Sequence, residues 1–479
     1  MPVNATDTHA AICGVRVANA NITVMGIGRF GGGLGIIQWL AEHGTSVLAT
    51  DLLPEEQCTS QIETLQPSIH SGKVQLRMGA HHPDDFLHAD VVIASPAVPQ
   101  PWDNPFLCAA RNADVPVTTE IQCVVERLNR DRVIAVTGSA GKSTTAAMIH
   151  HILNAMGHTA HFGGNIGGSL LSQLDGIDHA RDFVVLELSS AMLYWLGSAP
   201  EWNGGTAWSP RVAVVTNIEP NHINWHGCYE HYRNSKLNIV RNQRGHDIDS
   251  TVAWFDEHNP DLVRAISDAP TEPVFLTAAA AQPVSLTIPG QHNIRNAQLA
   301  VAASCELLHR CGEANADHAT LAQRAAVALQ TFRGLPHRLE YVGEVNGCRC
   351  YNDSKATTPA ATCLAVDAFD CADRIHLIVG GSDKGSDLSE LAHLASRAKS
   401  LLTIGVTGSS IAAEARDLAP ARTFECETLA NAWKTAIERS QPGDIILLSP
   451  GCASFDQFEN YEARGNMFRT LCTRASSGS

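Results

Sequence analysis

The chain has 479 residues, and at roughly 150 residues per domain this length predicts about three domains. Its 49 Asp and Glu residues outnumber its 34 Lys and Arg residues, and the resulting net charge of −15 argues against a general binder of nucleic acids or acidic membranes. A hydrophobic share of 44% and a charged share of 17% are typical of a globular protein rather than a disordered one.

The 14 cysteines are dispersed along the chain and never form a Cys-x-x-Cys pair. Zinc sites usually show paired ligands and disulfide frameworks belong to short secreted chains, so we expect reduced thiols. The N-terminal residues lack the cationic start and apolar block of a signal peptide, and no stretch has the roughly 18 apolar residues of a membrane helix. We therefore expect a cytoplasmic protein with no membrane insertion and no nucleic-acid partner.

Short apolar runs of strand length alternate with helical patterns through most of the sequence. Such runs, apolar on both faces, predict parallel sheets covered by helices on both sides, and hence an α/β fold class. The dipeptide Asn346-Gly347 is suited to a type I′ turn and predicts a β-hairpin. The predicted strands are Ile22–Met25, Ser46–Thr50, Val91–Ala94, Val133–Thr137, Phe183–Leu188, Val212–Thr216, Ile375–Val379, Leu401–Val406 and Ile445–Leu448.

Two domain boundaries are predicted from local composition. One lies near Thr118, after a proline-containing stretch, and the other lies near residues 334–336, just ahead of the predicted hairpin. The predicted domains are residues 1–118, 119–334 and 335–479.

The first predicted strand leads into a GxGxxG motif formed by Gly26, Gly28 and Gly31. A helical stretch follows, and the next strand ends at Asp51. This order of strand, glycine loop, helix, strand and acid is typical of a site for a nucleotide diphosphate, with Asp51 on a ribose or a base. From the motif alone NAD is the default ligand, and a tight turn without a ligand is the alternative.

A second glycine loop, between a strand and a helix, contains Gly138, Gly141, Lys142 and Ser143. It has two residues between its glycines where a Walker A motif has four, but the mechanism of that motif does not depend on the two missing residues. Consecutive N–H groups can cradle phosphate, Lys142 can reach the β- and γ-oxygens, and Ser143 can bind Mg²⁺. The loop predicts binding of ATP or GTP.

Polar residues follow the next two strands of the same region. Glu187 lies within a run that otherwise reads as a buried strand, where a carboxylate is costly unless it is paired or binds a metal. At the carboxyl end of a parallel strand it suits a Mg²⁺ ligand, and pairing with a structural Lys or Arg is the alternative. Asn217, Glu219 and His222 follow the neighbouring strand.

Ten motifs, taken together and in order, give the chain a family resemblance. They are TGSAGKSTT, GGNIGGSLL, ELSS, TNIEPNHINWHG, YRNSKLNIVRNQ, PGQHNIRNAQLA, FRGLPHRLE, YNDSKATTP, GGSDKG and LSPGCASFDQFENYEARG. With them the chain resembles the Mur ligases, the ATP-dependent amino-acid-adding enzymes of peptidoglycan synthesis, and among these the D-glutamate-adding branch.

The resemblance implies an N-terminal Rossmann-like domain for a UDP-sugar, a central P-loop ATPase with a mostly parallel sheet, and a C-terminal Rossmann-like domain for the amino acid. It implies addition of D-glutamate to UDP-N-acetylmuramoyl-L-alanine through an acyl phosphate by an enzyme that is expected to be a monomer. It also changes the expected ligand of the first glycine loop from NAD to the UDP of the substrate.

Residue roles follow from the same resemblance. Lys142, Glu187, His222 and Lys236 would be catalytic, and two Mg²⁺ ions would be held by Ser143, Glu187, His222 and the carbamate of a carbamylated Lys236. ATP would contact Gly138, Ser139, Ala140, Gly141, Lys142, Ser143, Thr144, Asn293, Asn296, Arg338 and Asp353. The UDP-sugar and the amino acid would contact Gly28, Arg29, Phe30, Asp51, Asn165, Lys355, Thr357, Lys384, Ser454 and Tyr461.

Some positions depart from the usual family pattern, among them Ala140 in place of Asn, Ser382 in place of an acid and Tyr461 in place of Phe. These departures leave open the identity and enantiomer of the amino acid, with L-glutamate as an alternative. Three other functions remain open, namely a folylpolyglutamate synthase, an NAD-dependent dehydrogenase with an appended NTPase, and a non-catalytic nucleotide-binding regulator. A folate substrate would not need the N-terminal glycine loop, and a regulator would not need Glu187, His222 and Lys236 together.

Overall fold

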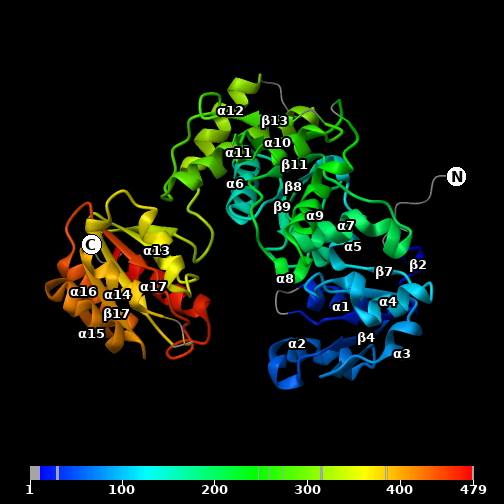
Figure 1. Cartoon of the computed structure of the whole chain (residues 1–479), viewed down its shortest axis with the longest axis horizontal. Coiled ribbons are helices and arrows are strands. Elements are labelled where there is room, and N and C mark those ends of the chain that lie inside the picture. The colour runs from blue at the N-terminus through cyan, green and yellow to red at the C-terminus, as the bar shows by residue number, and fades with distance from the viewer. Residues whose placement is uncertain are drawn as a thin grey trace. The chain divides into compact units, whose positions relative to one another are not determined.

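The computed structural model of the chain describes residues 11–28, 32–245, 247–257, 259–271, 273–312, 317–382, 385 and 387–476. It consists of two compact units (Figure 1). The first unit contains residues 1–283 and 296–328, and the second contains residues 284–295 and 329–479. Helix α11 (Gln291–Arg310) contributes to both.

The first unit begins with a five-stranded parallel sheet of order β5-β4-β3-β6-β7. Since β3 comes first along the chain and has later strands on both sides, the connections diverge at its carboxyl end, where α/β sheets bind ligands. Apolar side chains of α1 and α2 pack on one face, and those of α3 and α4 pack on the other. The elements are β3 (Asn21–Met25), α1 (Gly32–Glu42), β4 (Ser46–Asp51), α2 (Thr59–His70), β5 (Val74–Met78), α3 (Pro83–Leu87), β6 (Val91–Ala94), α4 (Pro105–Asn112) and β7 (Val117–Thr118), preceded by a small hairpin of β1 (Ala11–Ile12) and β2 (Val15–Arg16).

A second sheet in the same unit has six parallel strands in the order β13-β12-β11-β8-β10-β9. Every residue of β8, β10 and β11 is buried, as expected for strands covered on both faces. The carboxyl ends of these three adjacent strands therefore meet at one edge. The elements are α5 (Glu120–Val125), β8 (Val133–Thr137), α6 (Lys142–Ala155), β9 (Ala160–Gly164), β10 (Phe183–Glu187), α7 (Ser190–Asn203), β11 (Val212–Val215), α8 (Ile223–His226), α9 (Tyr229–Arg241), β12 (Ser250–Trp254), α10 (Pro260–Ser267), β13 (Pro273–Leu276) and α12 (His318–Ala328).

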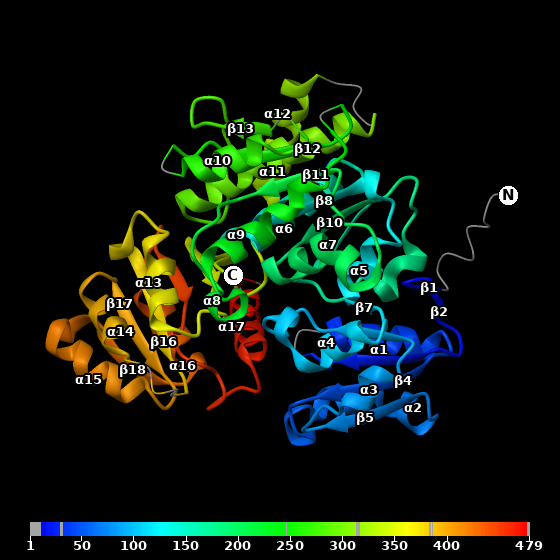
Figure 2. The ribbon, with the colours of Figure 1, turned by 45° about the vertical axis from the view of Figure 1, so that its right-hand side comes forward.

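The second unit is built on a six-stranded sheet of order β14-β15-β19-β16-β17-β18. Only β14 and β15 pair antiparallel, through a turn in which Asn346 and Gly347 have positive φ values of 52° and 77°, so the predicted hairpin is confirmed. Helices α13, α14 and α15 pack on one face and α16 and α17 on the other (Figure 2). The elements are β14 (Glu340–Val345), β15 (Cys348–Asn352), α13 (Pro359–Asp367), β16 (Ile375–Gly380), α14 (Ser389–His393), β17 (Ser400–Ile404), α15 (Gly408–Leu418), β18 (Thr423–Glu427), α16 (Leu429–Arg439), β19 (Ile445–Leu448) and α17 (Tyr461–Ser476).

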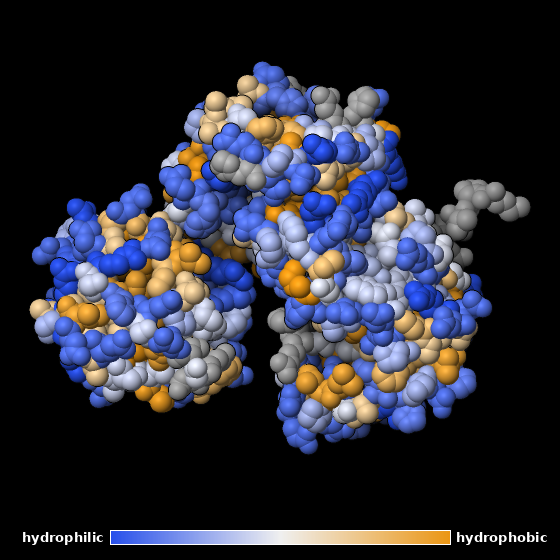
Figure 3. All heavy atoms as spheres, viewed as in Figure 1, coloured by the Kyte–Doolittle hydropathy of each residue, from blue (hydrophilic) through white to orange (hydrophobic). Residues whose placement is uncertain are grey.

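The α/β fold class is confirmed, and every predicted strand is present with ends that differ by at most two residues. No helix among the described residues is long and apolar enough to cross a membrane. On the face shown in Figure 3, hydrophilic residues cover much of the surface and apolar residues lie between them.

Candidate functional site

The loop between β8 and α6 (residues 138–141) contains two glycines that leave no room for a side chain. Gly138 has a φ of 154°, and a Cβ there would overlap the hydroxyl of Thr216. Gly141 has a φ of 81°, and its Cβ would lie 2.5 Å from Oδ1 of Asn296. A ligand can therefore approach this backbone closely. The same packing brings the predicted residue Asn296, on α11, against the glycine loop.

Asn217, to which the sequence assigned no role, holds this loop in place. Its Oδ1 accepts hydrogen bonds from the N–H groups of Ser139 and Ala140 at 3.0 and 2.9 Å, and its carbonyl oxygen accepts a further one from Ser139. The hydroxyl of Thr216 donates to the carbonyl of Ala140 at 2.6 Å. The end of β11 thus fixes the conformation of the loop that follows β8.

Helix α6 begins at Lys142, immediately after the loop. The N–H groups of a first helical turn have no acceptor within the helix, and the helix dipole adds positive potential there. The Lys142 ammonium lies back over the loop and donates to the carbonyl of Ser139 at 3.3 Å. Lys142, Ser143 and Thr144 therefore form an anion-binding end that suits phosphate groups.

Glu187 is the last residue of β10 and is 1% exposed. Its Oε1 accepts a hydrogen bond from the Asn165 amide at 2.9 Å, and the Asn165 N–H donates to the Glu187 carbonyl at 2.8 Å. Its Oε2 is buried and has no hydrogen-bond partner among the described residues. An orphaned carboxylate oxygen at the edge of a phosphate loop fits a cation ligand. Asn165, predicted independently, orients this carboxylate.

Lys236, on α9, is 2% exposed and reaches under the glycine loop. Its ammonium donates to the carbonyl of Gly138 at 2.8 Å and lies 4.9 Å from the centre of the Tyr232 ring. Burial, together with the nearby Lys142 cation, lowers the pKa of Lys236 well below its usual value, and the carboxylate of Glu187 opposes that shift. The neutral amine is therefore accessible to Lys236 at a far lower pH than for a surface lysine.

His222 immediately precedes α8 and has left-handed backbone angles, φ 50° and ψ 34°. Partial burial lowers the pKa of His222, and the cations of Lys236 and Lys142 lower it further. These influences keep the imidazole neutral, which is the form that binds metals. Lys142, Glu187, His222 and Lys236 thus act on one another electrostatically, as a cluster at one edge of the second sheet.

No group of three or more His, Cys, Asp or Glu side chains among the described residues could hold a metal ion. Mg²⁺ typically takes only one or two protein carboxylates and completes its shell with water and substrate phosphates. Glu187 together with the hydroxyl of Ser143 therefore fits a Mg²⁺ ion that arrives with a nucleotide better than a permanently bound metal.

Asp51, at the end of β4, is hydrogen-bonded to the backbone of the first glycine loop. Its two carboxylate oxygens accept hydrogen bonds from the N–H groups of Ile27 and Leu53, each at 2.9 Å. Gly28 has a φ of 80°, as the predicted turn requires. Asp51 therefore shapes the loop, and its contact with a nucleoside remains a prediction. The predicted residues Arg29, Phe30 and Lys384 lie outside the described residues.

Glu120 joins this first loop to the loop that carries Asn165. Its Oε1 accepts a hydrogen bond from the hydroxyl of Ser169 at 2.5 Å, and its Oε2 lies 3.9 Å from the position of a Cβ on Gly32, the first residue of α1. A Cβ on Gly35 would lie 2.6 Å from that of Ser169. The start of α1 therefore packs directly on the loop after β9. Burial raises the pKa of Glu120 to about 7.

Glu120 is expected to make the folded state less stable as the pH rises from about 4.5 to about 7. The folded protein keeps a proton in this interval that the unfolded chain releases, so stability is lost as the carboxyl ionises. In Glu120→Gln this dependence of stability on pH should disappear. At pH 8 the free energy of unfolding of the variant should exceed that of the wild type by up to about 3 kcal/mol. Thermal unfolding at pH 5 and pH 8 measures the effect. The exposed carboxylate in Glu126→Gln is the matched control, and parallel pH profiles for Glu120→Gln and wild type would contradict the expectation.

The second unit contains a cavity of about 560 Å³ beside the loop after β15. Arg338, Asp353 and Lys355 line its polar side, and Leu364 of α13 lines its apolar side. Burial raises the pKa of Asp353 to about 6, and the carboxylate accepts hydrogen bonds from the hydroxyl of Ser449 at 2.7 Å and the N–H of Leu339 at 3.1 Å. Arg338 and Asp353, both predicted to contact ATP, thus line one cavity together with Lys355.

The other predicted residues of this unit lie on neighbouring segments. The Lys355 ammonium lies 5.4 Å from the centre of the Tyr461 ring. Thr357 is half-buried just ahead of α13, and Ser454 is buried. Asn293 is buried and donates from its amide to the carbonyl of Pro289 at 2.5 Å. The structure therefore pairs Lys355 with Tyr461, whereas the described hydrogen bond of Asn293 is made to Pro289.

Arg464, on α17, lies in one of the quoted motifs, but no role was predicted for it from the sequence. It is 1% exposed and donates to the hydroxyl and the carbonyl of Ser354 at 3.0 and 2.9 Å. It also donates to the carbonyls of Cys452 and Ala453 at 3.1 and 3.2 Å. Arg464 thus holds the segment of Lys355 against the segment of Ser454. A fully buried arginine cannot be recognised from its own sequence neighbourhood.

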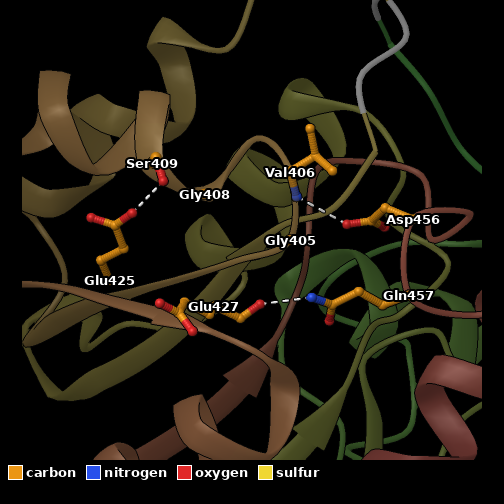
Figure 4. Close-up of a pocket in the computed structure, with 8 residues that line it drawn as sticks. All are labelled: Gly405, Val406, Gly408, Ser409, Glu425, Glu427, Asp456 and Gln457. Atoms are coloured by element: carbon orange, nitrogen blue, oxygen red, sulfur yellow. Dashed lines mark hydrogen bonds between the residues drawn. The ribbon is translucent and has the colours of Figure 1, made fainter.

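A separate hollow of about 270 Å³ in the second unit contains none of the predicted residues (Figure 4). It lies beside the ends of β17 and β18, and Glu425, Glu427 and Asp456 contribute carboxyl groups to its wall. Two of these carboxylates are hydrogen-bonded within the wall, Asp456 to the N–H of Val406 at 3.0 Å and Glu425 to the hydroxyl of Ser409.

Comparisons with known proteins agree with this arrangement. Three family models match the chain, the MurD-like N-terminal domain of Mur ligases at residues 20–119, the Mur ligase middle domain at 136–304 and the glutamate ligase domain of Mur ligases at 337–452. UDP-N-acetylmuramoylalanine–D-glutamate ligase of Koribacter versatilis is 33% identical, over 95% of this chain and 97% of that protein. The protein of the same name from Geobacter metallireducens is 32% identical, over 97% and 99%.

Solved structures show the same fold at lower sequence identity. UDP-N-acetylmuramate–alanine ligase from Thermotoga maritima superposes with a TM-score of 0.53 at 21% identity, over 96% of this chain and 100% of that one. A UDP-N-acetylmuramoyl-L-alanyl-D-glutamate–2,6-diaminopimelate ligase gives a TM-score of 0.53 at 16% identity, over 90% and 93%. Fold, glycine loop and family models lead to one conclusion: the chain belongs to the Mur ligase family.

Proposed function

We propose that this chain is an ATP-dependent ligase that adds D-glutamate to UDP-N-acetylmuramoyl-L-alanine in peptidoglycan precursor synthesis. One observation carries the proposal above all. Lys142, Glu187, His222 and Lys236 form a single electrostatic cluster around the second glycine loop. The cluster belongs to a chain that is about one-third identical, over nearly its whole length, to ligases named for this reaction.

The parts of the chain divide the work as follows in this proposal. Residues 1–118 bind the UDP-sugar at the first glycine loop, residues 119–334 bind the phosphates of ATP, and residues 335–479 receive the amino acid. The cavity that contains Arg338 and Asp353 is the candidate pocket for adenosine, because it offers an apolar wall and hydrogen-bonding groups on opposite sides. Because one chain supplies every proposed group, a monomer suffices, and we place its reaction in the cytoplasm.

The first chemical step activates a carboxylate. The carboxylate of the substrate's alanine does not react with an amine, because an oxide is too poor a leaving group. Attack of this carboxylate on the γ-phosphorus of ATP forms an acyl phosphate and releases ADP. Lys142 and the N–H groups at the start of α6 bind the phosphate oxygens and stabilise the charge on the transferring group.

A Mg²⁺ ion at this site would neutralise phosphate charge and align the transferring group. The residues present fit such an ion. Glu187 offers a buried oxygen that has no hydrogen-bond partner in the described part of the chain, His222 is held neutral, and the Ser143 hydroxyl lies at the start of α6. Asn165 fixes the second oxygen of Glu187, so the unpartnered one keeps its orientation.

Lys236 is proposed to carry a carbamate. A neutral lysine amine adds to CO₂, the new N–C bond forms a carbamate anion, and one proton leaves. Burial of Lys236 favours the neutral amine that this addition needs. The modification places an anion beside the Lys142 cation, which is a favourable charge pairing, and offers oxygen ligands for a second Mg²⁺.

The second chemical step forms the amide bond. The amino group of D-glutamate attacks the carbonyl carbon of the acyl phosphate, and phosphate leaves from a tetrahedral intermediate. Lys355, Thr357, Ser454 and Tyr461 are the described candidates for binding the amino acid, and Lys355 supplies positive charge for an acidic one. Lys384 is proposed for the same pocket on its motif alone.

The test is a phosphate-release assay with a panel of amino acids and acceptors. Release should require ATP, UDP-N-acetylmuramoyl-L-alanine and D-glutamate together, and Lys142→Ala should abolish it. Release only with L-glutamate, lysine or diaminopimelate would overturn the substrate assignment, and release with a folate acceptor would indicate a folylpolyglutamate synthase.

A further inference from the structure

A set of contacts outside the assigned residues joins the loop after β6 (residues 95–103, hereafter the β6 loop) to the short helix α8. The backbone N–H of Gln100 donates to the carbonyl of Trp225 at 3.2 Å, and its side-chain amide donates to the carbonyl of Asn224 at 3.3 Å. In return, the indole N–H of Trp225 donates to the carbonyl of Pro96 at 3.1 Å. The β6 loop is therefore hydrogen-bonded to α8 at two positions, Pro96 and Gln100.

Aromatic packing reinforces these hydrogen bonds. The centre of the Trp102 ring, in the β6 loop, lies 5.8 Å from the ring centre of Trp225, 4.4 Å from that of His231 and 5.3 Å from that of Tyr194. Trp225 is 8% exposed. Such ring pairs add to the free energy of burial and fix the orientation of the side chains that form them.

Helix α8 is also held from the side of the second sheet. Nε2 of His226 lies 2.9 Å from the hydroxyl of Ser190, the first residue of α7, and Nδ1 lies 2.8 Å from Nδ1 of His231. His226 is 2% exposed. Helix α8 thus lies between the β6 loop and the segment that follows Glu187.

The position of α8 determines the position of His222. The helix has only four residues, too few to be stable without contacts from the rest of the fold. It begins directly after His222, whose carbonyl accepts hydrogen bonds from the N–H groups of Trp225 and His226 at 3.0 and 3.1 Å. A displacement of Trp225 therefore carries the backbone of His222 with it.

The first residue of the β6 loop, Ser95, lies next to the start of the first glycine loop. The N–H of Ser95 donates to the carbonyl of Met25 at 2.8 Å, and a Cβ on Gly26 would lie 2.9 Å from Cβ of Ser95. The proposed UDP site and the proposed metal ligand His222 are therefore connected by one short segment of chain, hydrogen-bonded at both ends.

From this connection we propose that Gln100 and Trp225 are positioning residues that couple binding of the UDP-linked substrate at the first glycine loop to the placement of His222. The inference rests on the proposed function, which supplies the roles of the two sites. Neither residue touches the reacting groups, and the β6 loop and α8 transmit the effect through hydrogen bonds.

Trp225→Phe tests the coupling, because it removes the indole N–H that binds Pro96 and keeps an aromatic ring in place. We expect kcat to fall about 10-fold or more, as for other residues that act through a metal ligand, and the half-activating Mg²⁺ concentration to rise. The KM for the UDP-substrate should stay near its wild-type value. Gln100→Asn, which shortens the side chain but tolerates the left-handed φ of 44°, should act in the same direction.

Trp202→Phe is the matched control, because it removes a similar indole hydrogen bond, to the hydroxyl of Tyr194 at 3.2 Å, and keeps the Tyr194 ring, whose centre lies 5.8 Å from that of Trp225. It should leave kcat and the Mg²⁺ dependence unchanged. An equal loss of kcat in Trp202→Phe and Trp225→Phe would overturn the inference, as would wild-type kinetics in Trp225→Phe.

Hydrogen exchange tests the same coupling without turnover. UDP-N-acetylmuramoyl-L-alanine alone should slow exchange of the amides at residues 223–227 about 5-fold or more in wild type, and this effect should be lost in Trp225→Phe. Equal slowing in both proteins, or none in wild type, would overturn the coupling. Absence of phosphate release from the wild-type protein would instead overturn the proposed function, so the two failures are distinguishable.

Discussion

Lys236→Ala is expected to lower kcat by a factor on the order of 10²–10³, the size of loss seen when one preorganised polar group is removed from an active site. The variant removes the only proposed source of the carbamate oxygens. The neighbouring carbonyl of Gly138 also loses its hydrogen-bond donor, the Lys236 nitrogen 2.8 Å away. Initial rates of phosphate release at saturating substrates measure the change.

Restoring activity with added carboxylates distinguishes a carbamate on Lys236 from a purely structural role of this residue. Formate or acetate should restore part of the activity of Lys236→Ala, because a small carboxylate can occupy the space of the carbamate. The exposed Lys434 provides a control, and Lys434→Ala should behave as wild type. Full activity of Lys236→Ala in buffers depleted of CO₂ would refute the carbamate.

Glu187→Gln is expected to lower kcat by about 10²-fold or more and to raise the half-activating Mg²⁺ concentration. Glutamine has nearly the shape of glutamate and can still accept the hydrogen bond of Asn165, so the loop after β9 should keep its conformation. Only the charge of the unpartnered oxygen is lost. A Mg²⁺ titration of initial rates distinguishes this effect from a general loss of activity.

The control for Glu187→Gln is a carboxylate near the opposite end of the same strand. Asp182 precedes β10 and pairs with His161 at 2.9 Å, far along the strand from Glu187. Asp182→Asn should cost about 1 kcal/mol of stability or less and leave the Mg²⁺ dependence unchanged. An unaltered Mg²⁺ dependence in Glu187→Gln would contradict its assignment as a metal ligand.

The sequence predicted the central strands of the fold but missed several edge strands, for a physical reason. Strands such as β8 and β10 are buried on both faces and read as continuous apolar runs. The edge strands β5 and β18 have the sequences VQLRM and TFECE, in which polar and apolar residues alternate because one face is exposed. This alternation is the pattern of a half-buried strand, but it contains no continuous apolar run, and the strands above were predicted from such runs.

Much of the candidate site was also predictable, because it consists of local features. A glycine loop, a lysine at a helix start and an acid at a strand end can each be recognised from a few consecutive residues. The supports of the site could not be recognised in this way. Asn217 and Arg464 act on segments far away in sequence, and their roles follow only from the packing of the folded chain.

Tracing isotopic oxygen in the reaction tests the proposed chemistry most directly. UDP-N-acetylmuramoyl-L-alanine labelled with ¹⁸O in both oxygens of its alanine carboxylate is incubated with the protein, ATP and D-glutamate, and the products are analysed by mass spectrometry. An acyl-phosphate ligase transfers one labelled oxygen to the released phosphate and keeps the other in the new amide of the glutamate-containing product. Phosphate free of ¹⁸O, or a nucleotide product without added glutamate, would contradict the account.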